Sequence, residues 1–133
     1  MKILSSLVLL TLILQFSSNA YALSDCSKAE NDSEVLACSS ANRKEAEMNL
    51  NQEYENAKKR IADVFSQDVT ERKNYMDIFT KAQRSWLKFR QYQCEMESHP
   101  AEKGTNLNLD YTNTCIVKLD VERTNALKEI PYD

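Results

Sequence analysis

The scarcity of residues that interrupt helices is the strongest constraint on what this 133-residue chain can fold into. Glycine occurs once, at Gly104, and proline occurs twice, at Pro100 and Pro131. A β-sandwich or β-barrel needs many turns, and turns depend heavily on these two residue types. The sequence therefore predicts an all-α protein, with Pro100 and Gly104 in one connection between helices and Pro131 after the last helix.

Three long segments show the spacing of apolar residues that is typical of one helical face. We expect the first helix to begin near Asp32 and Ser33 and to end around residues 65–67. The second is expected from about Thr70 to residues 98–100. The third should begin near residue 110 or 112 and end before Pro131. The sequence gives no internal repeat and no low-complexity segment, and its length is enough for one domain and not two.

Each predicted helix carries a single apolar stripe. In the first helix it consists of Ala46, Leu50, Tyr54, Ala57, Ile61 and Val64. In the second it consists of Tyr75, Phe79, Ala82, Trp86 and Phe89. In the third it consists of Ile116, Leu119, Ala126 and Ile130. A helix with one apolar face is marginal alone, so we expect the three to pack as a small bundle.

The first 22 residues have the order of a secretory signal peptide. A basic Lys2 precedes an apolar run over residues 3–16, and the motif Ala-Tyr-Ala occupies positions 20–22. The run is short for a membrane span of about 20 residues, and the aspartate before Cys26 disfavours a lipoprotein. We expect cleavage after residue 22, export to the periplasm rather than the medium, and no stable membrane insertion afterwards. Residues 23–133 then form the mature helical domain.

All four cysteines, Cys26, Cys38, Cys94 and Cys115, lie in the mature domain. An even number in a small exported domain is typical of disulfides. Four cysteines allow three connectivities, and the sequence alone does not choose among them. We prefer Cys26–Cys38 with Cys94–Cys115, because both pairings are local and crossed pairings must meet a Cα distance limit across separate elements. A zinc site is disfavoured, since the cysteine spacings of 12, 56 and 21 hold no close ligand pair.

The charge balance restricts the class of partner. The full chain has a net charge of −3, and loss of Lys2 with the signal peptide makes the mature domain −4. Nucleic acid is disfavoured, because phosphate binding depends on a basic face. A basic protein partner would associate faster. We find no catalytic motif and expect neither an enzyme nor a cofactor.

Three segments carry a family resemblance. They are residues 46–54 (AEMNLNQEY), residues 82–90 (AQRSWLKFR) followed by Cys94, and Cys115 followed by Arg123 and Leu127. In this order they resemble the LprI-type lysozyme inhibitor N-terminal domain, a family of exported bacterial proteins. The resemblance covers essentially the whole mature domain and implies a lysozyme-inhibitor-like function. The chain departs from the family pattern at Glu47, where aspartate is usual, and at Asp120, where threonine is frequent.

We interpret the motif residues as architecture rather than as a binding site. They are Leu50, Asn51, Tyr54, Gln83, Trp86, Arg90 and Arg123. Arg123 lies on the apolar side of the third helix, where an unpaired guanidinium would be costly. We therefore expect Arg90 and Arg123 to bridge helices through carboxylates or backbone carbonyls. Glu47, Asn51, Glu53 and Asp120 are the candidate acceptors for Arg123.

The predicted long connection over residues 98–110 is the candidate partner-binding loop, because loops longer than about 12 residues are uncommon and often functional. Its candidate contact residues are His99, Lys103, Thr105, Asn106, Asn108 and Tyr111. A Cys94–Cys115 disulfide would close it and lower the ordering cost of binding. A merely tolerated flexible loop is the alternative interpretation.

Two functions remain open at this point. In the first, the exported protein blocks the glycan groove of a lysozyme with this loop. In the second, it is a periplasmic interaction or immunity-type module that binds another envelope protein or a toxin, for example through the exposed face of the first helix. The sequence does not determine the oligomeric state.

Overall fold

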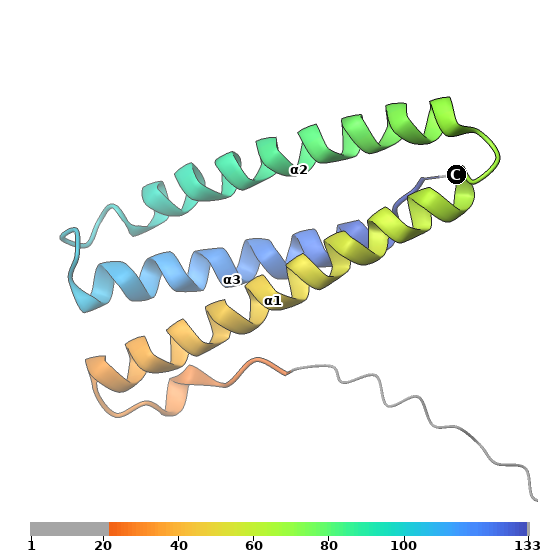
Figure 1. Cartoon of the computed structure of the whole chain (residues 1–133). Coiled ribbons are helices and arrows are strands. Elements are labelled where there is room, and N and C mark those ends of the chain that lie inside the picture. Colours follow the sequence, from red (N-terminus) through yellow and green to blue (C-terminus); the bar gives the residue numbers. More distant parts are fainter. Residues whose placement is uncertain (1–21, 133) are drawn as a thin grey trace, which may run out of the picture.

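The computed structural model describes residues 22–132, and these residues form three long helices and a short N-terminal arm (Figure 1). The arm contains the 3₁₀ helix η1 (Cys26–Lys28), and α1 (Asp32–Val64), α2 (Val69–Ser98) and α3 (Asn106–Lys128) follow. The prediction of an all-α three-helix bundle is confirmed. The predicted signal peptide lies, apart from its last residue, outside the described part. No helix of residues 22–132 is both long and apolar enough to cross a bilayer.

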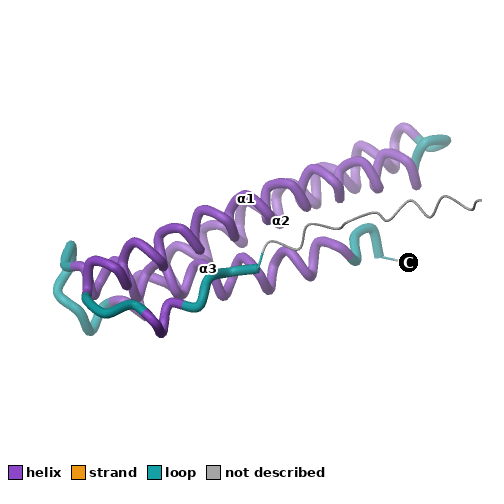
Figure 2. The backbone as a smooth tube through the Cα atoms, turned by 90° about the horizontal axis from the view of Figure 1, so that it is seen from below, coloured by secondary structure: helices purple, strands orange, loops and turns teal. Residues whose placement is uncertain are grey.

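The three helices lie side by side as rods of unequal length (Figures 1 and 2). α3 packs most extensively against α1 and less against α2, and α1 and α2 contact each other least. The turn between α1 and α2 lies at one end of the bundle, where the C-terminus also lies. The N-terminal arm and the connection between α2 and α3 lie at the opposite end.

Side chains cap the N-terminus of each helix. Asn31 Oδ1 accepts a hydrogen bond from the backbone of Glu34 at 3.0 Å, and Asp68 Oδ1 accepts one from Glu71 at 2.9 Å. These caps satisfy backbone N–H groups that have no intrahelical acceptor. The predicted starts of the first two helices were therefore correct to within one or two residues.

The predicted start of the third helix was wrong. Thr105 caps α3, so the helix begins at Asn106, four residues before Asp110. The connection between α2 and α3 therefore covers residues 99–105 rather than residues 98–110. The exposed leucines at 107 and 109 hid the helical period in the sequence, because they lie outside the buried face of α3.

The core has two parts. The larger cluster consists of Leu50, Ala57, Ile61, Phe79, Leu127 and Ile130, surrounded by half-buried aromatic residues. The smaller one contains Cys94, Cys115 and Ile116, with Leu119 packed against it. Both expected disulfides are present, Cys26–Cys38 with a Cα–Cα distance of 5.7 Å and Cys94–Cys115 with 5.5 Å. The smaller core therefore includes a covalent cross-link.

The predicted apolar stripe of α2 was only partly correct. Phe79 is buried and Tyr75 and Trp86 are half-buried, but Ala82 and Phe89 are exposed. The face that packs on the bundle instead contains Gln83 and Cys94. The disulfide to α3 sets this rotation of the helix, because Cys94 must point at Cys115. Val64, the last position of the predicted α1 stripe, is exposed as well.

Candidate partner-binding site

The α2–α3 connection forms a shallow hollow at the disulfide-bonded end of the bundle. The hollow has a volume of about 680 Å³ and is lined by Glu95, Ser98, His99, Pro100, Ala101, Glu102, Lys103, Asn108 and Thr112. The last turn of α2 and the first turns of α3 supply its walls, and the disulfide joins these two helices at Cys94, next to Glu95, and at Cys115, three residues after Thr112. A short connection closed in this way has few ways to rearrange.

Asn108 holds the connection in place from within α3. Its Nδ2 donates to the backbone oxygens of Ser98 at 2.9 Å and Ala101 at 3.4 Å. Its Oδ1 accepts from the backbone N–H of Gly104 at 3.2 Å. Gly104 has a φ of +85°, a conformation that residues with a Cβ rarely adopt. Asn108 is therefore a structural residue of the loop rather than a free donor for a partner.

The side chain of Thr105 also makes hydrogen bonds within the protein. Its hydroxyl donates to the backbone oxygen of Glu102 at 2.7 Å and accepts from the backbone N–H of Asn108 at 3.3 Å. The second bond is the N-cap of α3. Thr105 and Asn108 thus convert the seven-residue connection into a fixed surface.

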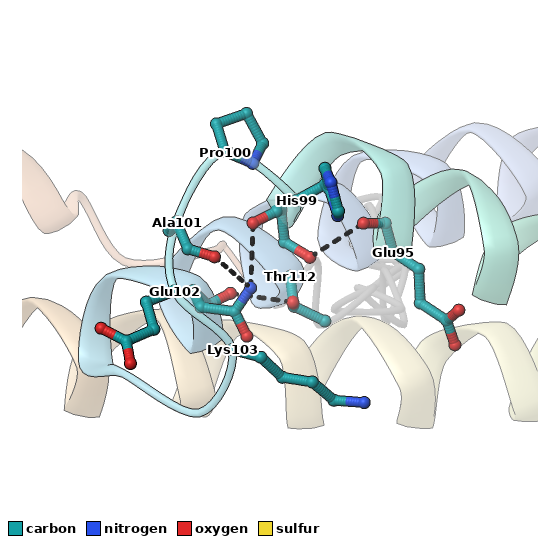
Figure 3. Close-up of a pocket in the computed structure, with 9 residues that line it drawn as sticks. Glu95, His99, Pro100, Ala101, Glu102, Lys103 and Thr112 are labelled. Atoms are coloured by element: carbon teal, nitrogen blue, oxygen red, sulfur yellow. Dashed lines mark hydrogen bonds between the residues drawn. The ribbon is translucent and has the colours of Figure 1, made fainter.

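The other four predicted contact residues are exposed. His99 and Lys103 belong to the connection, and Asn106 and Tyr111 belong to the first turns of α3. Figure 3 shows His99 and Pro100 on one side of the connection and the Lys103 side chain on the other. The structure therefore brings these donors to one end of the bundle, although it does not place them in one extended loop.

The charges of the chain are segregated along the bundle. We define the acidic end as residues 25–34 together with residues 95–110, which lie at the disulfide-bonded end in Figure 1. The acidic end contains eight acidic and two basic residues, a net charge of −6. The other residues of the segment 23–133 contain 12 acidic and 14 basic residues, a net charge of +2. Lys103 is thus one of two basic residues at an end of the bundle that carries eight acidic residues.

The polar residues of the family motif, Gln83, Arg90 and Arg123, form a layer with Asp120 between the two core clusters. Arg90 Nη1 contacts both carboxylate oxygens of Asp120, at 2.7 and 2.9 Å, and lies 3.7 Å from Glu47 Oε1. Arg123 Nε donates to Gln83 Oε1 at 2.9 Å. Both arginines bridge α2 and α3, as expected, although the acceptor of Arg123 is an amide rather than a carboxylate or backbone oxygen.

Aromatic residues complete this motif layer. The guanidinium groups of Arg90 and Arg123 each lie 5.7 Å from the centre of the Trp86 ring, a cation–π arrangement. The motif residues Tyr54 and Leu50 belong to the larger core instead: Tyr54 stacks on Phe79 with ring centres 4.9 Å apart, and Leu50 is buried. Asn51 is exposed and does not belong to the layer. The structure thus supports an architectural role for the motif.

Asp120 is the critical charge of the layer, because its side chain is fully buried. Burial raises the pKa of this carboxyl above its usual value, although the hydrogen bonds and charge of Arg90 oppose the rise. Burial also lowers the pKa of the Arg123 guanidinium. Removing Arg90 would therefore leave the buried Asp120 carboxylate without its cation.

One structural residue was missed in the sequence. Arg60 belongs to none of the motifs of the sequence, but its guanidinium donates to the backbone oxygens of Leu127 at 2.7 Å and Ile130 at 2.8 Å. It also pairs with Glu53 at 2.8 Å. Arg60 therefore caps the C-terminus of α3. No local signal in α1 could have identified this role, since the acceptors lie about 70 residues away.

Chemically, the disulfide-bonded end offers a surface for binding. Within residues 22–132, no group of three or more histidine, cysteine, aspartate or glutamate side chains is arranged to hold a metal ion. Exposed donors, an aromatic side chain and a strong negative field are instead present at a fixed connection. Such a surface fits a protein partner with a complementary positive charge.

The comparisons with known proteins agree with this architecture. The family described as "Lysozyme inhibitor LprI" matches residues 24–127. The chain is 26% identical over 113 residues to the uncharacterised protein R02472 of Rhizobium meliloti, covering 80% of this chain and 78% of that protein. It is also similar to the crystal structure of a DUF1311 family protein (pp0307) from Pseudomonas putida KT2440. That match has a TM-score of 0.69 and 26% identity, and it covers 78% of this chain and 97% of that one.

Proposed function

Because this chain belongs to the LprI family of lysozyme inhibitors, we propose that it is an exported, non-enzymatic protein that binds a lysozyme and blocks its glycan groove. The observation that carries the proposal is the fixed α2–α3 connection at the acidic end. Asn108, Thr105 and the Cys94–Cys115 disulfide hold this connection, so little conformational entropy is lost when it binds.

The chemistry of the partner suggests how the connection acts. A lysozyme cleaves glycan with two carboxyl groups that flank the substrate in an open groove. Lys103, His99 and Asn106 are exposed donors that could pair with these carboxyl groups. Tyr111, 41% exposed, offers an aromatic contact at the base of the connection. The connection thus takes the place of the glycan.

The charge distribution would accelerate the encounter. Many animal lysozymes are basic, and the acidic end carries a net charge of −6. Attraction between exposed charges raises the association rate and falls as salt shortens the screening length. We therefore expect inhibition to weaken as the ionic strength rises.

The two disulfides support export, because such bonds persist in oxidising compartments. We propose that residues 1–22 are a cleaved signal peptide and that residues 23–133 act in the periplasm. In that compartment an inhibitor would meet lysozyme that has crossed the outer membrane.

The proposal is tested by the rate at which lysozyme clears a suspension of bacterial cell walls. The oxidised protein should slow clearing at low salt and less so at high salt. The double variant Lys103→Ala, Asn106→Ala should weaken inhibition by about tenfold or more, which corresponds to about 1.4 kcal/mol. Lys59→Ala removes one exposed positive charge from α1, outside the acidic end, and should inhibit like the parent.

Equal inhibition by the double variant and the parent would discard the connection as the contact surface. Absence of any inhibition at micromolar protein would instead favour an interaction or immunity-type module. A pull-down of envelope proteins and toxins with the oxidised protein would then identify the partner.

A further inference from the structure

α2 carries a second apolar stripe that its own bundle leaves uncovered. The stripe consists of Ile78, Ala82, Ser85, Phe89, Tyr92 and Met96, all of them exposed. The four largest side chains are more than half exposed: Ile78 67%, Phe89 53%, Tyr92 62% and Met96 64%. We call this set the outer stripe. It runs along α2 for roughly 27 Å at 1.5 Å per residue.

The spacing of the outer stripe is that of a two-helix seam. Its members step by four, three, four, three and four residues, which is the alternation of the core positions of a coiled coil. The face of α2 that packs on α1 and α3 is centred roughly 120° away, at 100° per residue. A second helix could therefore pack on the outer stripe without displacing α1 or α3.

The outer stripe is complementary to itself when two copies run antiparallel. A two-fold axis that crosses the outer stripe between Ser85 and Phe89, at the level of residue 87, pairs residues whose numbers add to 174. Ala82 then faces Tyr92 of the second copy, Ser85 faces Phe89, and Ile78 faces Met96. In the Ala82–Tyr92 and Ser85–Phe89 layers a small residue opposes a large aromatic one, so the side-chain volumes are complementary. A parallel pair would set Phe89 against Phe89, where the rings would clash, and Ser85 against Ser85, where a cavity would remain.

The charges beside the outer stripe favour the same arrangement. Lys81, Lys88 and Glu95 follow one flank at seven-residue intervals and are exposed. In the antiparallel register each flanking residue is displaced by one residue from the stripe layers, so the numbers of flanking pairs add to 176. Lys81 of each copy then lies beside Glu95 of the other, and two opposite-charge pairs form. Lys88 meets its own copy at the axis, and this like-charge contact opposes association.

We propose that two copies of this chain associate through the outer stripe as an antiparallel, two-fold symmetric pair of α2 helices. A contact of one helix per copy over this length is at the small end of specific interfaces. The dimer is therefore in equilibrium with the monomer at micromolar concentrations or above. The two acidic ends point in opposite directions and both remain exposed, so the dimer does not depend on the proposed lysozyme contact.

The first experiment measures the mass of the oxidised full chain, expressed for export, by sedimentation velocity over a range from low to hundreds of micromolar. The parent should shift from monomer towards dimer as concentration rises. Phe89→Glu should remain monomeric throughout while keeping the helical circular dichroism of the parent, because Phe89 lies outside the core. Met48→Glu places the same charge on an exposed apolar position of α1 and should dimerise like the parent.

A charge exchange tests the register. Lys81→Glu and Glu95→Lys should each weaken the dimer, because each sets like charges against each other across the axis. The double exchange should restore the parental dissociation constant. Lys88→Ala should strengthen the dimer.

A parental protein that is monomeric at all concentrations would overturn the proposal. A double exchange that dimerises no better than either single variant would overturn it as well. Loss of lysozyme inhibition in a monomeric Phe89→Glu, with a monomeric parent, would show that the outer stripe binds the partner instead.

Discussion

The two ends of the bundle are held together by different physical means. At the hairpin end, which we define as the α1–α2 turn and the C-terminal residues beside it, half-buried aromatic rings cover the larger core. Phe65 and Tyr75 lie with ring centres 5.2 Å apart, and the Tyr75 hydroxyl accepts from the backbone of Tyr132 at 3.2 Å. At the acidic end the core is small, and a disulfide with side-chain bonds to the backbone supplements it.

This difference shows how a small domain can keep a polar surface in place. Burial of apolar side chains supplies stability where surface can be hidden from water. The acidic end, which we propose as the binding surface, is largely exposed, so it gains little from burial. Cross-links and capping side chains fix its geometry instead, because they act on the backbone without covering it. The polar layer around Arg90 and Asp120 lies between the apolar hairpin end and the cross-linked acidic end.

The largest effect is expected from breaking this polar layer. Arg90→Met leaves the buried Asp120 carboxylate without its cation and should destabilise the protein by about 3–5 kcal/mol at neutral pH. Arg43→Met is the matched control, because Arg43 is partly exposed and pairs with the partly exposed Glu47. Arg43→Met should cost much less. Urea denaturation of both variants measures the difference.

The pH dependence of Arg90→Met has a defined sign. Burial already raises the folded-state pKa of Asp120, and loss of the opposing guanidinium raises it further. A carboxyl whose pKa is higher in the folded state contributes most to stability at low pH, and that contribution is lost as pH rises through the folded-state pKa. The deficit of Arg90→Met should therefore be smallest in acid. A deficit independent of pH would contradict the role of Asp120.

An intermediate effect is expected from removing the cross-link at the acidic end. Cys94→Ala with Cys115→Ala opens a loop with a sequence separation of 21 residues. On the chain-entropy estimate this costs roughly 3 kcal/mol. Amide hydrogen exchange should accelerate first at residues 99–105, and inhibition should fall.

The comparison variant is Leu127→Ala, at a fully buried position of the larger core. It should cost a similar amount of stability, about 2–5 kcal/mol. It should accelerate exchange at the hairpin end instead. Identical exchange patterns in the two variants would show that the ends are not separate.

The smallest effect is expected from Asn108→Ala. This change removes three hydrogen bonds that hold the connection and should cost about 1–2 kcal/mol of stability. Exchange should accelerate at Gly104 while the hairpin end stays unchanged. Asn125→Ala, at an exposed position near the end of α3, is the matched control and should leave both measurements at parental values. Unaltered protection of Gly104 would show that Asn108 does not fix the connection.

Much of the fold could be predicted because it depends on local patterns. Few helix breakers, apolar residues at helical spacing and locally spaced cysteines led to three helices and both disulfides. The architectural role of Arg90 and Arg123 followed from the cost of an unpaired guanidinium on an apolar face. The candidate site was predicted less well. Thr105 and Asn108 were expected to contact a partner, but their side chains complete the N-cap of α3 and the connection before it.

The sequence by itself determined the helical class, the number of helices and the chemistry available for cross-linking, because these depend on residues close together in the chain. Only the tertiary structure decided which side of α2 faces the bundle. α2 is apolar on two sides, at Phe79 and Trp86 and again at Phe89 and Tyr92, and helical periodicity alone cannot rank them. The bond from Cys94 to Cys115 and the ion pair from Arg90 to Asp120 fix the rotation, since each requires partners on another helix.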